Sequence, residues 1–411
     1  MVTLQKNHVD NAVVQILNTL SDNGHDAYLV GGAVRDIYFG ITPKDYDIAT
    51  SATPRQVKRI FGKQARIIGR RFRLAHIYFG REYYEVSTFR REPTAEERSS
   101  RPEDDGTIIW QDNQFGTLEE DAFRRDFTVN ALYSNPVQDG KVIDKVNGLV
   151  DLQNATVKTI NDPETCIAED PVRIIRALKL VARYKFTLAP ELAKVIDRHK
   201  ADIQKSSPSR LFEEVLKIFS TSYAQETLET FHQYGLLHHY LPFLDEIWQT
   251  EAGEIIRKLL TERDNRKKGG WYSNSRTLAL ITVAFPAVAE ELGIPAVENL
   301  NDYQPELPVR VRDSVRNMFS PLPVPKTLSS RSRDAILLLP DFLSKDHQNR
   351  LLHHPEYRYA RELFSLLTTV LEWDPEIIEQ WPNNGKWRPK RKKKKTRRGK
   401  HSKKWHHKKV D

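Results

Sequence analysis

Hydrophobic positions follow two different spacings in the first third of the chain. Apolar residues three or four positions apart predict helices over residues 9–20, 33–39 and 53–60. Short runs rich in β-branched and aromatic residues predict strands over residues 27–30, 46–49, 65–68, 73–79 and 83–89, with further candidates at 127–133 and 142–143. The pattern predicts a small mixed sheet with helices packed against it.

The remaining pattern divides into a polar stretch and a long helical region. Residues 91–116 are charged and lack apolar periodicity, which predicts a long mobile loop. From residue 163 onward helical spacing returns, over residues 172–182, 191–203, 211–220, 224–232, 253–260 and 358–373. We therefore expect the α+β class, with a mixed-sheet head at residues 1–150, an all-helical neck at 151–245 and a helical body at 246–380.

Charge separates the last segment from the rest. Residues 386–411 carry 15 Lys and Arg and one acid, so this segment has a formal charge of +14 although the whole chain has only +9, which leaves −5 for the other residues. Like charges repel and little apolar area is available to bury, so residues 381–411 are expected to be disordered. Such a tail neutralises phosphates without reading sequence, which predicts RNA binding, and its alternative role is a solubilising tail.

Amino-acid composition indicates the cellular compartment. Hydrophobic residues make up 39% of the 411, and no run of about 18 apolar residues suggests a membrane helix. The N-terminal residues lack the charged and apolar blocks of a secretory signal. A single cysteine, Cys166, cannot form an internal disulfide. These features predict a cytoplasmic protein, with Cys166 as a small buried side chain.

Two aspartates in the expected strand 46–49 region form the first candidate site. Side chains alternate along a strand, so Asp45 and Asp47 should project from one face while Tyr46 points to the other. Two carboxylates so close repel each other unless a cation lies between them, and Mg²⁺ prefers such oxygen ligands. A lone Asp-x-Asp is more often a solvated turn, so the surrounding sequence decides its meaning.

A glycine pair precedes the aspartates. Gly31 and Gly32 end an expected strand and begin an expected helix, so backbone amides there can approach a triphosphate closely. Arg35 can add a forked contact to phosphate. A Gly-Gly pair alone usually marks a plain turn, but the combination with a nearby Asp-x-Asp is much more specific.

The joint motif carries a family resemblance. GGAVRD at residues 31–36 followed by KDYD at 44–47 resembles the signature of class II nucleotidyltransferases in the polymerase β superfamily. This class contains CCA-adding tRNA nucleotidyltransferases and bacterial poly(A) polymerases. The resemblance implies a catalytic head domain in which Asp45 and Asp47 hold Mg²⁺ and ATP is a substrate.

A second motif, RRDFTVN at residues 124–130, resembles the segment that reads the ribose in this family. The resemblance makes Arg125 a nucleotide-binding residue and Asp126 an acceptor for the 2′-hydroxyl. Asp126 is also our candidate for a third catalytic carboxylate. Glu85, on the expected strand 83–89, competes for that role, and the sequence leaves both open.

A third motif, EDPVRIIRA at residues 169–177, resembles the family's protein template for the incoming base. Asp170 and Arg173 are three residues apart and should share a helix face, although such pairs are usually surface salt bridges. Arg176 follows as a further nucleotide-binding candidate. The stretch SRLFEE at residues 209–214 resembles a motif that supports the nucleotide-binding helices, so we expect a structural role for it.

One stretch distinguishes the two activities of the class. GRRFRLAH at residues 69–76 resembles poly(A) polymerases, with Arg70, Arg71 and Arg73 as candidate RNA or phosphate contacts. LHHPEYR at 352–358 and the basic tail resemble the later parts of the same enzymes. The resemblance implies template-independent addition of AMP from ATP to RNA 3′ ends, in RNA decay or processing. It also implies a monomer that does not bind a membrane and that has RNA-decay proteins as candidate partners. The alternatives are a CCA-adding enzyme and a non-catalytic RNA-binding protein.

Overall fold

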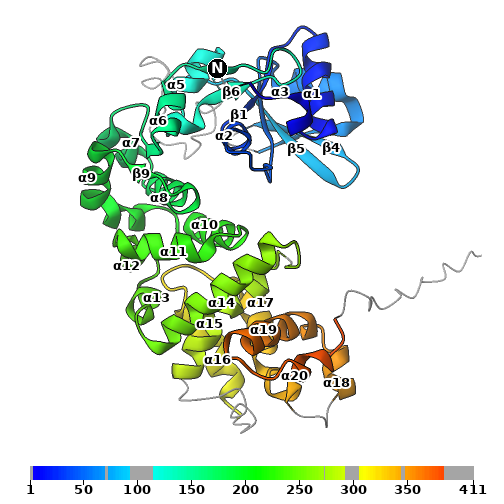
Figure 1. The fold of residues 1–411 in the computed structure, drawn as a ribbon, viewed down its shortest axis with the longest axis vertical. Coiled ribbons are helices and arrows are strands. Elements are labelled where there is room, and N and C mark those ends of the chain that lie inside the picture. The colour runs from blue at the N-terminus through cyan, green and yellow to red at the C-terminus, as the bar shows by residue number, and fades with distance from the viewer. Residues whose placement is uncertain are drawn as a thin grey trace, which may run out of the picture.

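The computed structural model describes residues 3–69, 73–92, 114–272, 274–291, 305–343 and 348–383. The described chain forms an arc, with a sheet-containing head at the top of Figure 1, a column of helices along one side and a helical body at the bottom. We call helices α7 to α13 the neck and helices α14 to α20 the body. Within the described residues, no helix is long and apolar enough to cross a membrane.

The head is built on a seven-stranded mixed sheet in the order β3-β4-β5-β2-β1-β6-β7. Only β2 and β5 run parallel, and the other neighbours are antiparallel. The strands are β1 (Ala27–Val30), β2 (Asp47–Thr50), β3 (Ala65–Ile68), β4 (Leu74–Phe79), β5 (Glu82–Thr88), β6 (Leu132–Ser134) and β7 (Val142–Asp144).

Alternation along the strands gives the sheet two apolar faces. Leu29 and Ile48 belong to the large core, together with side chains of α1 (Asn11–Asp22) and α3 (Pro54–Phe61). Their neighbours in sequence, Val30 and Ala49, belong to a smaller cluster with Ala122 of α5 (Leu118–Phe123). The central strands are therefore covered on both sides, and their ends are left to carry polar groups. The head also contains α2 (Gly32–Tyr38) and α6 (Gly148–Gln153).

The neck consists of α7 (Pro163–Glu169), α8 (Val172–Tyr184), α9 (Pro190–His199), α10 (Pro208–Phe219), α11 (Ala224–Gln233), α12 (Leu236–Tyr240) and α13 (Pro242–Ile247). Its one departure from an all-helical region is a parallel pair of two-residue strands, β8 (Thr156–Val157) and β9 (Thr187–Leu188). This pair ties the chain after the head to the end of α8, because the Thr187 amide donates to the Ala155 carbonyl at 2.8 Å.

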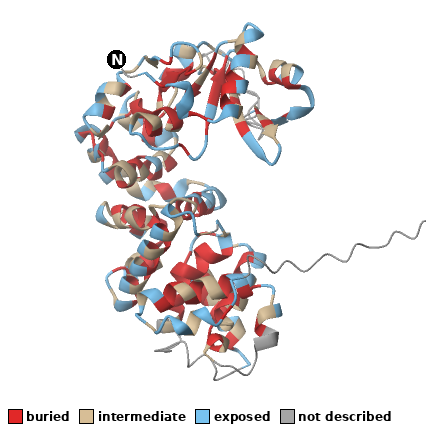
Figure 2. Cartoon of the chain, turned by 45° about the vertical axis from the view of Figure 1, so that its right-hand side comes forward, coloured by how far each residue is buried: buried red, intermediate tan, exposed pale blue. Residues whose placement is uncertain are grey.

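The body consists of α14 (Glu251–Lys268), α15 (Arg276–Glu291), α16 (Leu307–Asn317), α17 (Lys326–Leu337), α18 (Gln348–His353), α19 (Tyr357–Val370) and α20 (Glu376–Glu379). Figure 2 shows buried residues concentrated between these helices and within the sheet of the head. At the junction with the neck, Arg263 of α14 is 0% exposed, pairs with Asp264 and donates to the Phe219 and Thr221 carbonyls.

Most expected elements are confirmed within about three residues, although the helix expected over residues 253–260 continues to Lys268 and the one expected over 191–203 ends at His199. One expected element is not confirmed. The strand expected over residues 127–133 is wrong: Thr128–Asn130 forms a 3-10 turn, and β6 begins only at Leu132. The turn arises because the Thr128 hydroxyl donates to Asp151 at 2.7 Å and its amide donates to the Lys158 carbonyl at 3.0 Å. Residues 93–113 of the expected loop and residues 384–411 lie outside the described residues.

Candidate active site

Asp47 is the first residue of β2, at one end of the sheet, and Asp45 lies two residues before it. Both side chains are exposed, and Tyr46 between them is only 7% exposed, as expected for alternating residues. The parallel pairing of β2 with β5 places Asp47 opposite Glu85. All three carboxylates line one cavity of about 560 Å³.

The electrostatics of Asp47 reflect this crowding. Surrounding protein raises the pKa of Asp47 to about 6 by desolvation, although solvent still reaches the side chain in the cavity. Glu85 and Asp45 raise the pKa further, and Arg125 and Arg176 oppose them. Without a cation nearby, ionisation of Asp47 is therefore energetically unfavourable. A divalent metal bound at these carboxylates would remove that penalty.

Glu85 faces a histidine as well as Asp47. Its Oε1 lies 3.4 Å from Nε2 of His76, the residue opposite it on β4, and the His76 ring stacks on Tyr83 at 4.3 Å. Among the described residues, no three acidic, His or Cys groups already surround a common metal position. The oxygen donors of the cavity are of the kind that a hard cation prefers, and Glu85 is paired with His76 in this arrangement.

The glycine pair makes the tight turn that the sequence predicts. Gly31 has φ 68° and ψ −119°, a conformation that suits glycine, and a Cβ there would lie 3.3 Å from the Asn130 carbonyl oxygen. Gly32 begins α2. Arg35 differs from the expectation of a phosphate contact, because its side chain is buried, donates to Asn130 Oδ1 and lies over the Tyr184 ring at 4.8 Å.

Asp36, the residue after Arg35 on helix α2, connects the head to the neck. Asp36 is buried and accepts from Arg183 Nη2 at 2.7 Å and from the Tyr184 hydroxyl. Arg183 also lies over the Tyr223 ring at 5.1 Å. Because Arg35 and Asp36 both reach α8, the glycine turn and the neck are held in one arrangement.

Arg125 and Asp126 point in different directions. Arg125 donates to Asp121 Oδ2 at 2.9 Å and to the Tyr133 hydroxyl at 2.9 Å, while its charge acts on Asp47. It also lies near the turn, with Nη1 3.7 Å from where a Cβ of Gly31 would be. Arg125 thus lies beside the glycine turn and also acts electrostatically on Asp47.

Asp126 is buried at the boundary with the neck. Its Oδ2 lies 3.0 Å from Arg176 Nη2 of α8, and its Oδ1 accepts from the Asn130 side chain at 3.0 Å. Burial alone would raise the pKa of Asp126, but Arg176 and the hydrogen bonds from Asn130 and the Phe127 amide lower it. The buried Oδ2 has no hydrogen bond of good geometry. Asp126 is therefore paired with Arg176, whereas Glu85 lies opposite Asp47 on the neighbouring strand.

Asp170 lies in the bend between α7 and α8 rather than on a shared helix face with Arg173. It caps the Val172 amide at 3.2 Å, and Arg210 of α10 holds its two oxygens with both Nη atoms, at 3.0 and 2.7 Å. Arg210 belongs to the SRLFEE stretch, for which we expected a structural role. Glu214 of the same stretch has such a role, because it is buried and accepts from Lys179 of α8 at 3.5 Å.

Arg173 is directed to the other side of the bend. It donates to the Cys166 carbonyl at 2.8 Å and to Glu169 Oε2 at 3.0 Å. Together with Arg124 and Arg125 of the head, it lines a cavity of about 520 Å³ between head and neck. Cys166 also lines it, and burial raises the pKa of its thiol, so this cysteine stays protonated near neutral pH.

The arginine run divides between described and undescribed residues. Arg70 and Arg71 lie outside the described residues, and Arg73 is exposed directly before β4, with its carbonyl accepting from Arg90 at 3.2 Å. Sequence reasoning missed Arg183, Tyr184 and Arg210 as parts of the site. The hydrophobic pattern predicts helices that end or begin next to these residues, but no local signal shows which helices meet.

The comparisons with known proteins identify the family. Residues 27–158 match the poly A polymerase head domain, and residues 185–247 match the probable RNA and SrmB- binding site of polymerase A. Poly(A) polymerase I of Salmonella typhimurium is 35% identical over 92% of this chain and 83% of that protein, and that of Escherichia coli O6:H1 is 34% identical over 89% and 80%.

CCA-adding enzymes match less of the sequence but share the fold. The Bacillus subtilis CCA-adding enzyme is 35% identical over 53% of this chain and 52% of that protein. The crystal structure of the Bacillus stearothermophilus CCA-adding enzyme in complex with CTP covers 89% of this chain and 80% of that chain, at 22% identity and a TM-score of 0.58. The chain belongs to the poly(A) polymerase family of class II nucleotidyltransferases.

Proposed function

We propose that this chain adds AMP from ATP to RNA 3′ ends without a template and releases pyrophosphate, in RNA decay or processing. The observation that carries the proposal is the meeting of Asp45, Asp47 and Glu85 in one cavity at the end of the sheet. Adenylate transfer is favoured over CCA addition because the poly(A) polymerases align with 92% of the chain, whereas the CCA-adding enzyme of Bacillus subtilis aligns with 53%.

The acidic cavity suits Mg²⁺. Asp45 and Asp47 would hold it, and we propose Glu85 rather than Asp126 as the third carboxylate, because Glu85 is the residue opposite Asp47 and raises its pKa. When bound, Mg²⁺ activates an attacking hydroxyl and neutralises charge on the phosphates. The carboxylates of this chain orient the RNA 3′-hydroxyl toward the α-phosphate, and Arg125 supplies a fixed positive charge beside them.

The nucleotide would extend from the glycine turn toward the neck. Gly31 and Gly32 leave room for phosphate beside Arg125. We assign ribose recognition to Asp126 acting with Arg176, which reaches it from α8 at 3.0 Å. We assign base recognition to Asp170 and Arg173, which lie on the two sides of the bend before α8. Arg35 acts instead as a positioning residue, because its guanidinium is buried against Tyr184.

One incubation distinguishes the candidate functions. Purified protein with Mg²⁺ receives either an oligo(A) RNA or a tRNA lacking its CCA end, with ATP or CTP as the nucleotide. Long A tails on the oligo(A) RNA from ATP alone support adenylate transfer. Incorporation of CTP into the tRNA supports the CCA-adding alternative, and RNA binding without incorporation supports a non-catalytic RNA-binding protein.

A matched pair of variants links the result to the cavity. Asp47→Asn should abolish incorporation. Asp139→Asn removes an exposed carboxylate whose nearest cation is Lys141 at 3.7 Å, and it should leave incorporation unchanged. Equal activity in both variants would show that Asp47 is not part of the catalytic centre.

A further inference from the structure

The body contains a cavity whose charge the reaction above does not use. Its volume is about 470 Å³, and it lies where the N-terminal ends of α15 and α17 meet the first turn of α19. Three arginines line it, Arg276, Arg331 and Arg358, with Tyr359 between two of them. We call this cavity the arginine pocket. It includes the end of the LHHPEYR stretch, to which the sequence assigns no role.

Two of the guanidinium groups are fixed in place by neighbouring side chains. Arg331 lies 5.3 Å and Arg358 4.4 Å from the centre of the Tyr359 ring, which is only 5% exposed. Arg331 also donates to the buried Glu356 at 2.9 Å, and Arg358 donates to the Tyr359 hydroxyl. The positive charges are therefore pre-organised, which lowers the entropic cost of binding an anion.

The charge of the pocket is not fully neutralised. No Asp or Glu is among the described residues that line it. Arg276 has an exposed partner, Glu213, at 3.4 Å, and within the described part of the chain no carboxylate pairs with Arg358. The remaining lining is rich in hydrogen-bond donors, from Asn274, Ser275, Thr277 and Thr327.

The helix ends add to the same field. The first turn of α17 has no side-chain cap, because its N-cap residue is Pro325. The amides of Lys326 and Thr327 have no partner within the helix, so they are available to an anion beside the arginines. The pocket therefore combines guanidinium, hydroxyl and amide donors, the set that binds phosphate in proteins generally.

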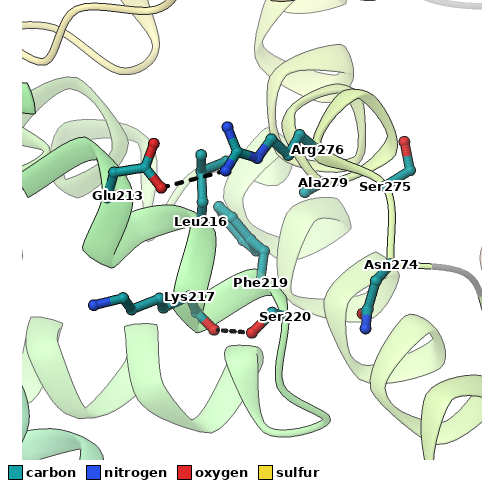
Figure 3. Close-up of a pocket in the computed structure, with 9 residues that line it drawn as sticks. All are labelled: Glu213, Leu216, Lys217, Phe219, Ser220, Asn274, Ser275, Arg276 and Ala279. Carbon is teal, nitrogen blue, oxygen red and sulfur yellow. Dashed lines mark hydrogen bonds and ion pairs between the residues drawn. The ribbon is translucent and has the colours of Figure 1, made fainter. Parts of the chain in front are cut away.

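The pocket continues toward the neck. Asn274, Ser275 and Arg276 also line a second cavity of about 250 Å³ against α10. Figure 3 shows Arg276 extending from α15 toward Glu213, with Lys217 on the same helix as Glu213. Two adjoining cavities that share Arg276 form a path with basic groups from α19 to α10, which suits an extended polyanion better than a single small ion.

The start of this path is within electrostatic reach of the catalytic end of the head. Lys267, at the end of α14, donates to Asn274 at the edge of both cavities. Burial lowers the pKa of Lys267 to about 8, with help from Arg263 and from Lys44, the residue before Asp45. The charge of Lys44 on the head therefore acts electrostatically on Lys267 at the end of α14. This helix end lies on the open side of the arc in Figure 1.

We propose that the arginine pocket binds the sugar-phosphate backbone of RNA upstream of the 3′ end that lies at Asp45 and Asp47. This inference rests on the proposed function for its RNA substrate. The pocket anchors the chain by backbone contacts, so it holds RNA of any sequence while successive nucleotides are added. Short RNAs that reach only the catalytic cavity gain nothing from it.

The test measures RNA binding rather than catalysis. Fluorescent oligo(A) RNAs of increasing length are titrated by anisotropy, without ATP, at several salt concentrations, against the full chain. The double variant Arg276→Ala/Arg358→Ala should lose about tenfold in affinity for long RNA, with a salt slope smaller by about 0.7 for each phosphate that the variant no longer neutralises. Affinity for the shortest RNA should not change.

Two further variants exclude trivial causes. Thr327→Glu adds a carboxylate to the pocket without removing an arginine, and an acid in the first turn favours the helix, so it should fold and show the same loss. Arg310→Ala removes an exposed arginine of α16 outside the pocket and should bind like the parent. Thermal melting verifies each fold. Unchanged affinity and slope in both pocket variants, or an equal loss in Arg310→Ala, would overturn the proposal.

A separate arm tests a free anion. If pyrophosphate stabilises the parent but not the double variant against heat, while their RNA affinities agree, the pocket binds a small anion and the proposal is wrong. Adenylate addition to a short RNA is measured on the same samples. Failure of that reaction in the parent, with the binding differences intact, would refute the proposed function but leave the pocket assignment standing.

Discussion

Arg210 of α10 holds Asp170 in a forked ion pair, with Nη1 3.0 Å from Oδ1 and Nη2 2.7 Å from Oδ2. Asp170 lies in an extended conformation between two helices, so helix geometry does not fix its side chain. The fork from Arg210 fixes it instead. Arg210 lies outside the expected base-reading motif at residues 169–177, yet it fixes the orientation of the Asp170 side chain within that motif.

The first prediction concerns this fork. Arg210→Ala leaves Asp170 held only by the Val172 amide, so kcat/KM for ATP should fall by about tenfold or more and discrimination against CTP should weaken, because misplaced polar groups no longer distinguish the two bases. Arg210→Lys keeps the charge without the fork and should be intermediate. Arg198→Ala, which breaks an exposed neck pair with Glu164, is the control and should match the parent. Unaltered selectivity in Arg210→Ala would contradict the role.

The second prediction is a pH dependence set by Asp47, whose pKa is raised to about 6. Below this pH the carboxylate takes up a proton and loses its affinity for a cation, so kcat/KM should fall about tenfold for each pH unit. More Mg²⁺ should move the midpoint to lower pH, because metal and proton compete. A midpoint that ignores Mg²⁺ concentration would exclude Asp47 as its origin.

The same shift predicts the sign of a stability effect. The pKa of Asp47 is higher in the folded chain than its ordinary value of 3.8, so the ionised form destabilises the fold near neutral pH. That cost is released as pH falls through about 6. In metal-free buffer at about pH 7, Asp47→Asn should therefore raise Tm slightly while removing activity, and the difference in Tm should shrink as pH falls from about 6 and vanish only below 3.8. A clearly lower Tm at neutral pH would contradict the assigned desolvation.

The third prediction separates the two candidates for the third carboxylate. Glu85→Gln should reduce kcat by at least about a hundredfold, because it removes charge where the transition state is stabilised. Asp126→Asn should retain the chemical step and instead accept deoxyribonucleotides more readily. ATP and dATP turnover of both variants gives the answer, with Asp139→Asn, an exposed carboxylate outside the cavity, as the control. The reverse order of losses would return the role to Asp126.

The sequence predicts local relationships well and distant ones poorly. Alternation along one strand suffices to place Asp45 and Asp47 together and Tyr46 in the core. The pairing of Asp47 with Glu85 requires β5 to lie beside β2, a neighbour that no local pattern specifies. Asp170 and Arg210 are 40 residues apart and meet only because α10 packs near the bend before α8.

Arg35 shows how context can reverse a local expectation. Its place after a glycine turn is typical of a phosphate contact, and that is the expected role. The structure buries the guanidinium between Asn130 and Tyr184, two residues from separate later parts of the chain. The ring of Tyr184 is supplied by α8, so only the packing of neck on head determines where Arg35 points.

The fourth prediction concerns the basic tail. Removing residues 386–411 deletes a formal charge of +14, so affinity for RNA should fall and its salt slope should flatten by counterion release. Addition of a single nucleotide to a saturating short RNA should survive, because the deleted residues include none of the candidate catalytic groups. Anisotropy titrations over a salt series test the first claim, and an unchanged slope would refute it.

The fifth prediction concerns the joint between neck and body. Arg263 is completely buried, and Tyr272 lies under its guanidinium at 5.4 Å. Arg263→Ala leaves Asp264 buried and unpaired and removes the donors to the Phe219 and Thr221 carbonyls, which should cost about 3–5 kcal/mol.

A variant that replaces both members of the Arg263–Asp264 pair serves as the control. Arg263→Met/Asp264→Asn replaces both charges and should recover part of the loss, because no isolated charge remains in the interior. Chemical denaturation followed by intrinsic tryptophan fluorescence, to which Trp248 in the core contributes, measures both variants. Because Phe219 also lines the cavity that adjoins the arginine pocket, Arg263→Ala should weaken the binding of long RNA more than of short RNA at temperatures where it stays folded. A full loss of stability in the double variant would place the stabilisation in packing rather than in the charge pair.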